Sequence, residues 1–293
     1  MSHPSVSRRT ALRQLAVLSA AGGAAQLTHA AEPAATPPAA APVHPPPTGL
    51  REGQEQIAIL VYPEFTALDA LGPHYALSGM MGASVRFVAK TRDPVRCEGA
   101  RDGGLLVQPH LTFDECRDRL DLLLVPGGLS GTMAAIADPA TRAFVARAGR
   151  QARCAASVCT GSLLLGAAGL LNGRRATSHW QTLDLLREVG ATPVAERVVF
   201  DGTDRATAAG VSAGLDLGFA LVQRYRGDFY AKGMQLLGEY DPQPPFPKGG
   251  NPRTADREVV DLLDQMHAPV VAKLRDLLRT ARHDTDGVRY FGP

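Results

Sequence analysis

The sequence lacks the features that mark several common classes of protein. Its 293 residues carry a formal net charge of only +2, so it has no electrostatic footprint for nucleic acid. Past the N-terminal region, no apolar stretch is long and uncharged enough to span a bilayer. Its four cysteines include no C-x-x-C pair, which argues against a structural zinc site. What remains, at 45% hydrophobic residues, is a globular composition that can form one core.

Residues 1–30 have the order of features found in an export signal. Arg8 and Arg9 precede a weakly apolar stretch rich in Ala and Gly, and small residues near position 30 offer a cleavage site. This resembles a twin-arginine signal, although Ala11 stands where that signal usually has Phe. The alternative is a disordered basic tail. The signal predicts an exported, periplasmic protein that folds in the cytoplasm and has no membrane contact after signal removal.

Residues 31–51 read as a linker because they are mostly Ala and Pro. Proline fixes φ and removes a backbone donor, so this stretch cannot build a core. The folded domain is therefore predicted to span residues 52–285.

Within this domain, short apolar runs alternate with segments of helical periodicity. The alternation predicts an α/β fold, with a mainly parallel sheet sandwiched by helices. An amphipathic pattern over 254–282 predicts a C-terminal helical extension, which Pro269 should kink. The expected strands are 56–62, 84–90, 120–128, 154–159, 191–200 and 205–210, with a further extended piece within 105–113. Helices are expected at 66–80, from 138, 160–171, 181–189 and 212–225.

One cysteine lies where a strand is expected to turn into a helix, in the stretch SVCTGSLLLG. Free N–H groups of the first helical turn would lower the pKa of the Cys159 thiol, leaving an exposed and activated sulfur. Thr160 offers a hydroxyl and an N–H beside it, and Gly161 leaves room for a tight turn. From this stretch alone, a packed cysteine is an equal alternative. The remaining cysteines are interpreted as ordinary packed or half-exposed residues: Cys97, Cys116 and Cys154.

The order of four blocks carries a family resemblance. ILVYPEFTALDALGP, DLLLVPGG, VCTGSLLLGAAGLLNGRRATSHW and GVSAGLDLGFALV together resemble the DJ-1/PfpI superfamily, the glutamine amidotransferase-like group with a flavodoxin-like fold. Within it, the chain is most similar to the isonitrile hydratase group. Cys-Thr-Gly replaces the Cys-His-Gly of PfpI-type hydrolases, and Asp69 stands where the wider superfamily often has Glu. The resemblance covers roughly residues 56–282.

The resemblance implies a mechanism and roles for individual residues. Cys159 would be the nucleophile, and Asp69 would exchange a proton with the thiol or with the reacting carbon. Gly127 and Gly128 would direct N–H groups toward a developing anion, and Thr160 would hold water or the substrate nitrogen. The reaction implied is hydration of a small-molecule isonitrile to an N-substituted formamide through a thioimidate. It requires no metal or organic cofactor, and the superfamily commonly forms homodimers.

Three further residues are weaker candidates. His179 follows the helix after the cysteine, where the superfamily often has a histidine, and it is a candidate base or substrate-binding residue. A lone histidine is more often structural, and this reading is stronger still for His74. Tyr75 departs from the pattern, since many relatives have Glu two residues after the Gly-Pro pair. If that Glu shapes the pocket, the substrate preference here differs.

Two other classes of function stay open. The same site could perform amidase, protease, glyoxalase or deglycase chemistry, which Cys-His-Gly would have favoured. Alternatively, an exported binding or redox-sensing protein could use Cys159 as an oxidisable or pocket-lining thiol. AraC-type regulators carry a similar domain but add a DNA-reading region that this sequence lacks, so no nucleic-acid partner is expected.

Overall fold

The computed structural model describes residues 53–99, 104–116 and 119–286. The predicted signal at 1–30 and the predicted linker at 31–51 lie outside these residues and stay predictions. None of the described helices is long and apolar enough to cross a membrane.

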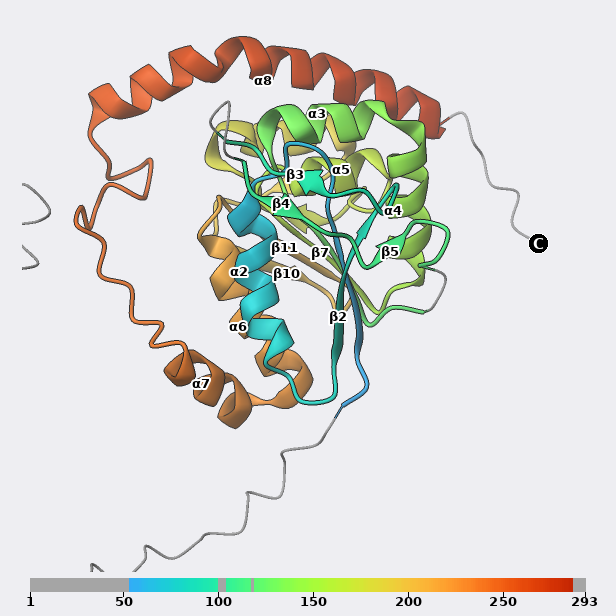
Figure 1. The fold of residues 1–293 in the computed structure, drawn as a ribbon. Coiled ribbons are helices and arrows are strands. Elements are labelled where there is room, and N and C mark those ends of the chain that lie inside the picture. The colour runs from blue at the N-terminus through green and yellow to red at the C-terminus, as the bar shows by residue number, and fades with distance from the viewer. Residues whose placement is uncertain (1–52, 100–103, 117–118, 287–293) are drawn as a thin grey trace, which may run out of the picture. The chain divides into compact units, whose positions relative to one another are not determined.

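A mainly parallel sheet forms the centre of the fold, as predicted (Figure 1). Its strands are β1 (Gln56–Leu60), β2 (Ser84–Ala89), β5 (Leu111–Thr112), β6 (Leu122–Val125), β7 (Cys154–Val158), β10 (Val198–Asp201) and β11 (Arg205–Ala208). They pair in the order β10-β11-β7-β6-β1-β2-β5. Among the described strands of this sheet, only β10 runs antiparallel to its neighbour. The carboxyl ends of the parallel strands therefore share one edge, where α/β proteins bind ligands.

Helices cover both faces of this sheet. One layer contains α2 (Ala67–Ser78), α6 (Ala213–Arg226) and α7 (Asp228–Leu237). The other contains α3 (Leu129–Ala137), α4 (Pro139–Gln151), α5 (Gly161–Ala167) and the 3-10 helix η1 (Trp180–Val189). The long helix α8 (Arg257–Asp286) packs across α3, α5 and η1. Two small ribbons pair β3 (Val95–Arg96) with β4 (Leu106–Val107) and β8 (Arg175–Ala176) with β9 (Thr192–Pro193).

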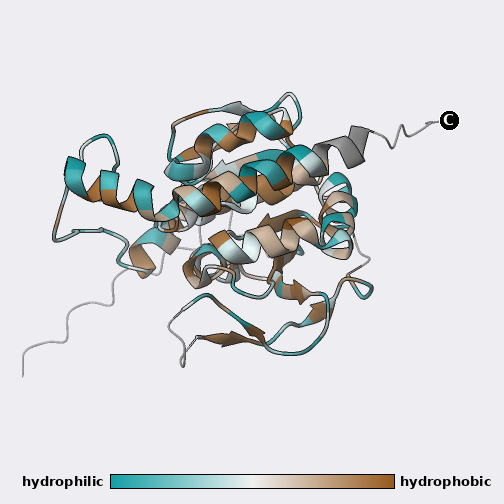
Figure 2. Ribbon diagram, turned by 90° about the horizontal axis from the view of Figure 1, so that it is seen from above, coloured by the Kyte–Doolittle hydropathy of each residue, from teal (hydrophilic) through white to brown (hydrophobic). Residues whose placement is uncertain are grey.

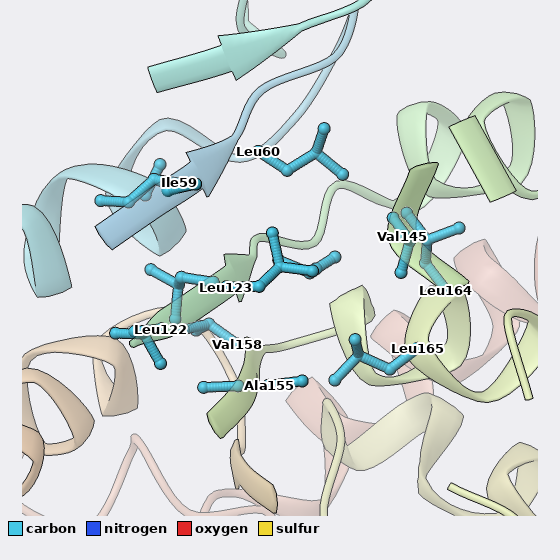
Figure 3. Packing of buried hydrophobic residues seen from close by; sticks show 14 of the residues in the cluster. Ile59, Leu60, Leu122, Leu123, Val145, Ala155, Val158, Leu164 and Leu165 are labelled. Atoms are coloured by element: carbon cyan, nitrogen blue, oxygen red, sulfur yellow. The ribbon is translucent and has the colours of Figure 1, made fainter. Parts of the chain in front are cut away.

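The core lies between the sheet and its helices. Every residue of β6 and β7 is buried, as expected for strands covered on both faces. Figure 3 shows Ile59, Leu123 and Val158 of the central strands, and Leu164 of α5, among the packed side chains. All four are fully buried. Burying one such side chain contributes roughly 1.5–3 kcal/mol, so the central strands hold the loops at their carboxyl ends in place.

Glycines allow α2 and α6 to pack closely. A Cβ on Gly218 would lie 3.0 Å from Cα of Pro73, and one on Gly214 would lie 3.2 Å from its Cδ. Pro73 is inside α2, where its ring fits against these bare positions. This contact fixes α2, the helix that carries Asp69.

Several local predictions were correct in kind but wrong in extent. Asp138 caps α4 by accepting a hydrogen bond from Thr141 N–H, with Pro139 at the first helical position, as predicted. The helix after Cys159 ends at Ala167, because the chain turns at Gly169 with φ +76°. The segment 180–189 is a 3-10 helix, and neither α3 nor α7 was expected.

The predicted C-terminal helix is α8. It is one continuous helix through Pro269, and Figure 2 shows hydrophobic and hydrophilic residues mixed along it. Its buried side chains include Leu274, Leu278 and Ala281, which share one face at helical spacing.

Candidate active site

Cys159 lies directly after β7 in a strained conformation. Its φ is +58°, in the left-handed region that non-glycine residues rarely adopt, at a cost of about 1–2 kcal/mol. Its N–H donates to the carbonyls of Ala208 (3.0 Å) and Ala209 (2.8 Å). Its own carbonyl accepts from the hydroxyls of Ser162 (3.1 Å) and Ser178 (3.2 Å). These contacts hold the strained peptide, and strain held in this way is concentrated at functional sites.

Gly161 makes the turn possible. A Cβ at this position would run into the carbonyl oxygens of Val125 and Pro126, at the end of β6. The start of α5 therefore approaches the loop after β6 more closely than any other residue would allow.

Asp69 is fully buried in the first turn of α2. Its Oδ2 accepts a hydrogen bond from Gly127 N–H at 2.9 Å. Burial raises the pKa of this carboxyl to about 7, an effect that the Gly127 N–H and the Cys159 thiol partly oppose. The negative charge of Glu98 raises the pKa further. Asp69 can therefore both hold and release a proton near neutral pH.

The expectation of an exposed, acidic thiol is wrong. Cys159 is only 6% exposed. Burial raises the pKa of its thiol, and the neighbouring Asp69 raises it further. The N–H groups of Thr160 and Val211 act in the opposite direction but do not overcome desolvation. The thiol and the carboxyl therefore form a coupled pair that shares its protons.

The two glycine N–H groups do not have the role expected of them. Gly127 N–H is taken by Asp69, and Gly128 N–H donates to Oγ1 of Thr160 at 3.0 Å. Buried N–H groups need a partner, and both find one within the protein. The backbone donors that act on the sulfur are those of Thr160 and Val211. Val211 carried no signal in the sequence.

The Thr160 hydroxyl belongs to a buried chain of hydrogen bonds. Its Oγ1 lies 2.8 Å from Oγ1 of Thr132, which lies 3.1 Å from the hydroxyl of Tyr62. Tyr62 donates its proton to the Pro126 carbonyl at 2.6 Å. Thr132 must then donate to Tyr62, and Thr160 to Thr132. The hydroxyl proton of Thr160 is thus committed to the scaffold, so this hydroxyl can hold water or substrate only as an acceptor.

This geometry has relatives among known proteins. The model of the DJ-1/PfpI family matches residues 55–224. The chain belongs to the DJ-1/PfpI family. It is 43% identical to isonitrile hydratase from Pseudomonas putida over 220 residues, which cover 75% of this chain and 92% of that protein. The crystal structure of a THiJ/PfpI family protein from Pseudomonas syringae superposes with a TM-score of 0.76 at 44% identity, covering 82% of this chain and 98% of that one.

Other enzymes of the DJ-1/PfpI family match over a shorter region. A deglycase from Thermococcus kodakarensis is 33% identical over 100 residues, covering 34% of this chain and 60% of that protein. The family and the fold are therefore established, while the chemistry must come from the site.

The His179 ring lies close to the turn around Cys159, since a Cβ on Gly210, the residue before Val211, would lie 2.9 Å from its Cδ2. His179 accepts a hydrogen bond from Gln181 N–H at 3.4 Å and caps η1. Burial lowers its pKa, and so does His267 on α8. No hydrogen bond among the described residues joins His179 to the pair. His74 stacks on Phe87, with ring centroids 5.0 Å apart.

Tyr75 is 43% exposed and packs beside Gly238, where a Cβ would lie 2.6 Å from its Oη. Six positions after Asp69, it faces about 240° around the helix from the carboxyl.

A cavity opens elsewhere on the same edge of the sheet. Its volume is about 510 Å³, and it lies beyond β1 and β2, against α3. It reaches Tyr62, at the end of the hydroxyl chain, but Cys159 and Asp69 are not in its lining. Within the described part of the chain, no group of three or more His, Cys, Asp or Glu residues is placed to hold a metal ion.

Proposed function

We propose that this protein hydrates isonitriles to N-substituted formamides, with Cys159 as nucleophile and Asp69 as the group that moves protons. The observation that carries the proposal is the buried Asp69 carboxyl, whose pKa is raised to about 7. It lies beside Cys159, whose backbone is strained and whose thiol is nearly buried. Identity of 43% to an isonitrile hydratase over most of both chains supports the same chemistry.

The first step forms a thioimidate. Asp69 accepts the thiol proton as sulfur attacks the terminal carbon of R–N≡C, and it passes that proton to the same carbon. The product is R–N=CH–S–Cys159, and the Asp69 carboxylate is restored. Because the pKa of the thiol is raised, the sulfur depends on Asp69 to take its proton as it bonds to the carbon.

The second step consumes water. Asp69 takes a proton from water as its oxygen attacks the thioimidate carbon, and it delivers the proton to nitrogen. The adduct, R–NH–CH(OH)–S–Cys159, then collapses. Its carbon–sulfur bond breaks, the hydroxyl proton passes through Asp69 to sulfur, and R–NH–CHO leaves. One water is consumed and the thiol is regenerated.

The closed surroundings of the thiol favour a narrow electrophile. The terminal carbon of an isonitrile is linear and unsubstituted, so it can reach a sulfur that is 6% exposed. A carbonyl substrate carries substituents around its reacting carbon. We therefore place glyoxalase and deglycase chemistry second.

We extend the proposal to cellular context and assembly. Export through the twin-arginine signal would place the enzyme in the periplasm, which fractionation of the producing cell tests. A homodimer is consistent with large exposed apolar side chains such as Leu68, Met81 and Leu106. Light scattering of the purified protein at a monomeric mass would contradict it. We expect no nucleic-acid partner.

The deciding experiment measures formation of N-cyclohexylformamide from cyclohexyl isocyanide. We expect Cys159→Ala and Asp69→Asn to abolish turnover while circular dichroism stays native. Cys154→Ala is the matched control, because it removes a buried free thiol from the other end of the same strand. Its activity should be within about twofold of wild type. A wild type with a reduced thiol and no turnover would reject the proposal and favour carbonyl substrates.

A further inference from the structure

Glu98 is an exposed acidic residue that is anchored beside the active site. Its N–H donates to the Phe65 carbonyl at 2.9 Å, and the Thr66 hydroxyl donates to its Oε1 at 2.5 Å. Phe65 also forms a bridge with Cys97, which fixes this part of the chain after β3. Thr66 immediately precedes α2, and its carbonyl accepts a hydrogen bond from Asp69 N–H at 3.1 Å. Glu98 is thus hydrogen-bonded to Thr66, which lies three positions before Asp69 in the chain.

Two carboxyl groups act by charge on the thiol. Asp69 and Glu98 both raise the pKa of Cys159. Glu98 also raises the pKa of Asp69 and of Tyr62. Asp69 is fully buried and Glu98 is exposed, so Glu98 lies on the solvent side of the pair. A substrate that reaches the sulfur therefore meets the negative charge of Glu98.

We propose that Glu98 is a specificity-determining residue that disfavours anionic substrates and admits neutral or cationic ones. For isonitriles this rests on the proposed function, since it names the class of R group that the same site accepts. A carboxylate on the substrate would meet like charge at Glu98. Such juxtaposition selects against the wrong partner rather than strengthening the right one.

The test compares two substrates that share a skeleton and differ in charge. Isocyanoacetate is anionic, and its methyl ester is neutral. We expect the wild type to prefer the ester. Glu98→Gln should raise the ratio of kcat/KM for isocyanoacetate to kcat/KM for the ester about fivefold, and effects on the reacting groups themselves cancel in this ratio. The gain should shrink as salt is raised, because the screening length falls.

Glu64→Gln is the matched control. Glu64 is exposed on the same loop, two residues before Thr66, and its charge is not among those that act on Cys159. It should leave the substrate ratio unchanged. Thr66→Val removes the anchor but keeps the charge of Glu98, and it should move the ratio in the same direction as Glu98→Gln by a smaller factor. The Thr66 side chain makes no helix-capping bond that this change would disturb.

A second measurement does not depend on isonitrile chemistry. Iodoacetate and iodoacetamide both alkylate a thiol with release of iodide, and only iodoacetate is anionic. Mass spectrometry of the Cys159 peptide gives both rates. Glu98→Gln should shift the ratio of the two rates toward iodoacetate by about fivefold. If the isonitriles are not turned over but this shift is present, the proposed hydratase activity is rejected and the role of Glu98 in selecting against anions is kept. An unchanged ratio in both assays, or an equal effect of Glu64→Gln, would overturn the role of Glu98.

Discussion

Cys154 and Cys159 lie at the start and just beyond the end of the same strand, yet they have opposite surroundings. Both are buried, at 2% and 6% exposure. Burial raises the pKa of Cys154 to about 11, and Arg224 and Arg205 partly oppose that rise. Burial also raises the pKa of Cys159, and there Asp69 adds to the rise. If thiol acidity chose the nucleophile, the cation-flanked Cys154 would be the better one.

The comparison shows what distinguishes a reactive thiol here. Cys154 sits in regular β7, whereas Cys159 has a positive φ and lies beside a buried carboxyl whose pKa is about 7. Reactivity in this fold therefore depends on a proton partner and a held geometry, more than on a low thiol pKa. Three sets of variants test this contrast.

The largest effect is expected from Gly127→Ala. The added Cβ would lie 2.6 Å from Oγ1 of Thr160 and 2.9 Å from Oδ2 of Asp69. It would therefore displace both the Asp69 carboxyl and Thr160, the residue that follows Cys159. A displacement of about 1 Å can cost 10²-fold in rate, and overpacking costs about 1–3 kcal/mol. We expect kcat/KM to fall about 100-fold. The midpoint of urea unfolding should move to a lower urea concentration, because the variant is less stable.

Gly233→Ala is the control for this change. A Cβ there meets no heavy atom within 4 Å, and alanine favours the helix by up to about 1 kcal/mol. It should keep full activity. Wild-type activity in Gly127→Ala would mean that the Asp69 carboxyl tolerates movement, and the held geometry would lose its importance.

The second effect concerns stability against pH. The pKa of Asp69 is about 7 in the folded protein against an ordinary 3.8, so the folded state binds more protons between these values. The stability contributed by protonated Asp69 is complete below pH 4 and is lost as pH rises through 7. About three pKa units correspond to roughly 4 kcal/mol.

Asp69→Asn removes this dependence. The free energy of unfolding of the variant, minus that of wild type, should move in favour of the variant by roughly 4 kcal/mol between pH 4 and pH 8. Urea unfolding at several pH values measures it, and the other ionisable groups cancel in the difference. A constant difference across this range would contradict a raised pKa and with it the proton-sharing pair.

The contrast between the cysteines was only partly visible in the sequence. Local patterns located the turn after β7, the Asp138 cap and the succession of strands along the chain, because these depend on neighbouring residues. The burial of Cys159 and the partners of the Gly127 and Gly128 N–H groups depend on packing between distant segments. Thr132 and Tyr62 meet across 70 residues, and Thr132 belongs to a helix that the pattern did not predict. Glu98 looks like any exposed acid until the chain after β3 is seen beside α2.

The smallest effect separates two serines near the strand. Ser178 Oγ donates to the Cys159 carbonyl and lies 3.0 Å from Oγ1 of Thr182. Ser157 is buried within β7, and its hydroxyl has no hydrogen-bond partner among the described residues. Ser178→Ala should lower the free energy of unfolding by about 1–2 kcal/mol, since it leaves the strained peptide less held.

Ser157→Ala should instead be neutral or stabilising by up to about 1 kcal/mol, because it removes a buried hydroxyl that gains nothing in return. Urea midpoints of the two variants, with equal m-values, give the comparison directly. The two serines would then differ as the two thiols do. Ser178, which holds the Cys159 peptide, would contribute to the free energy of unfolding, and Ser157, within the strand, would not. Equal losses from both variants would instead mean that Ser157 has a partner, such as a buried water, and that the strand is not inert along its length.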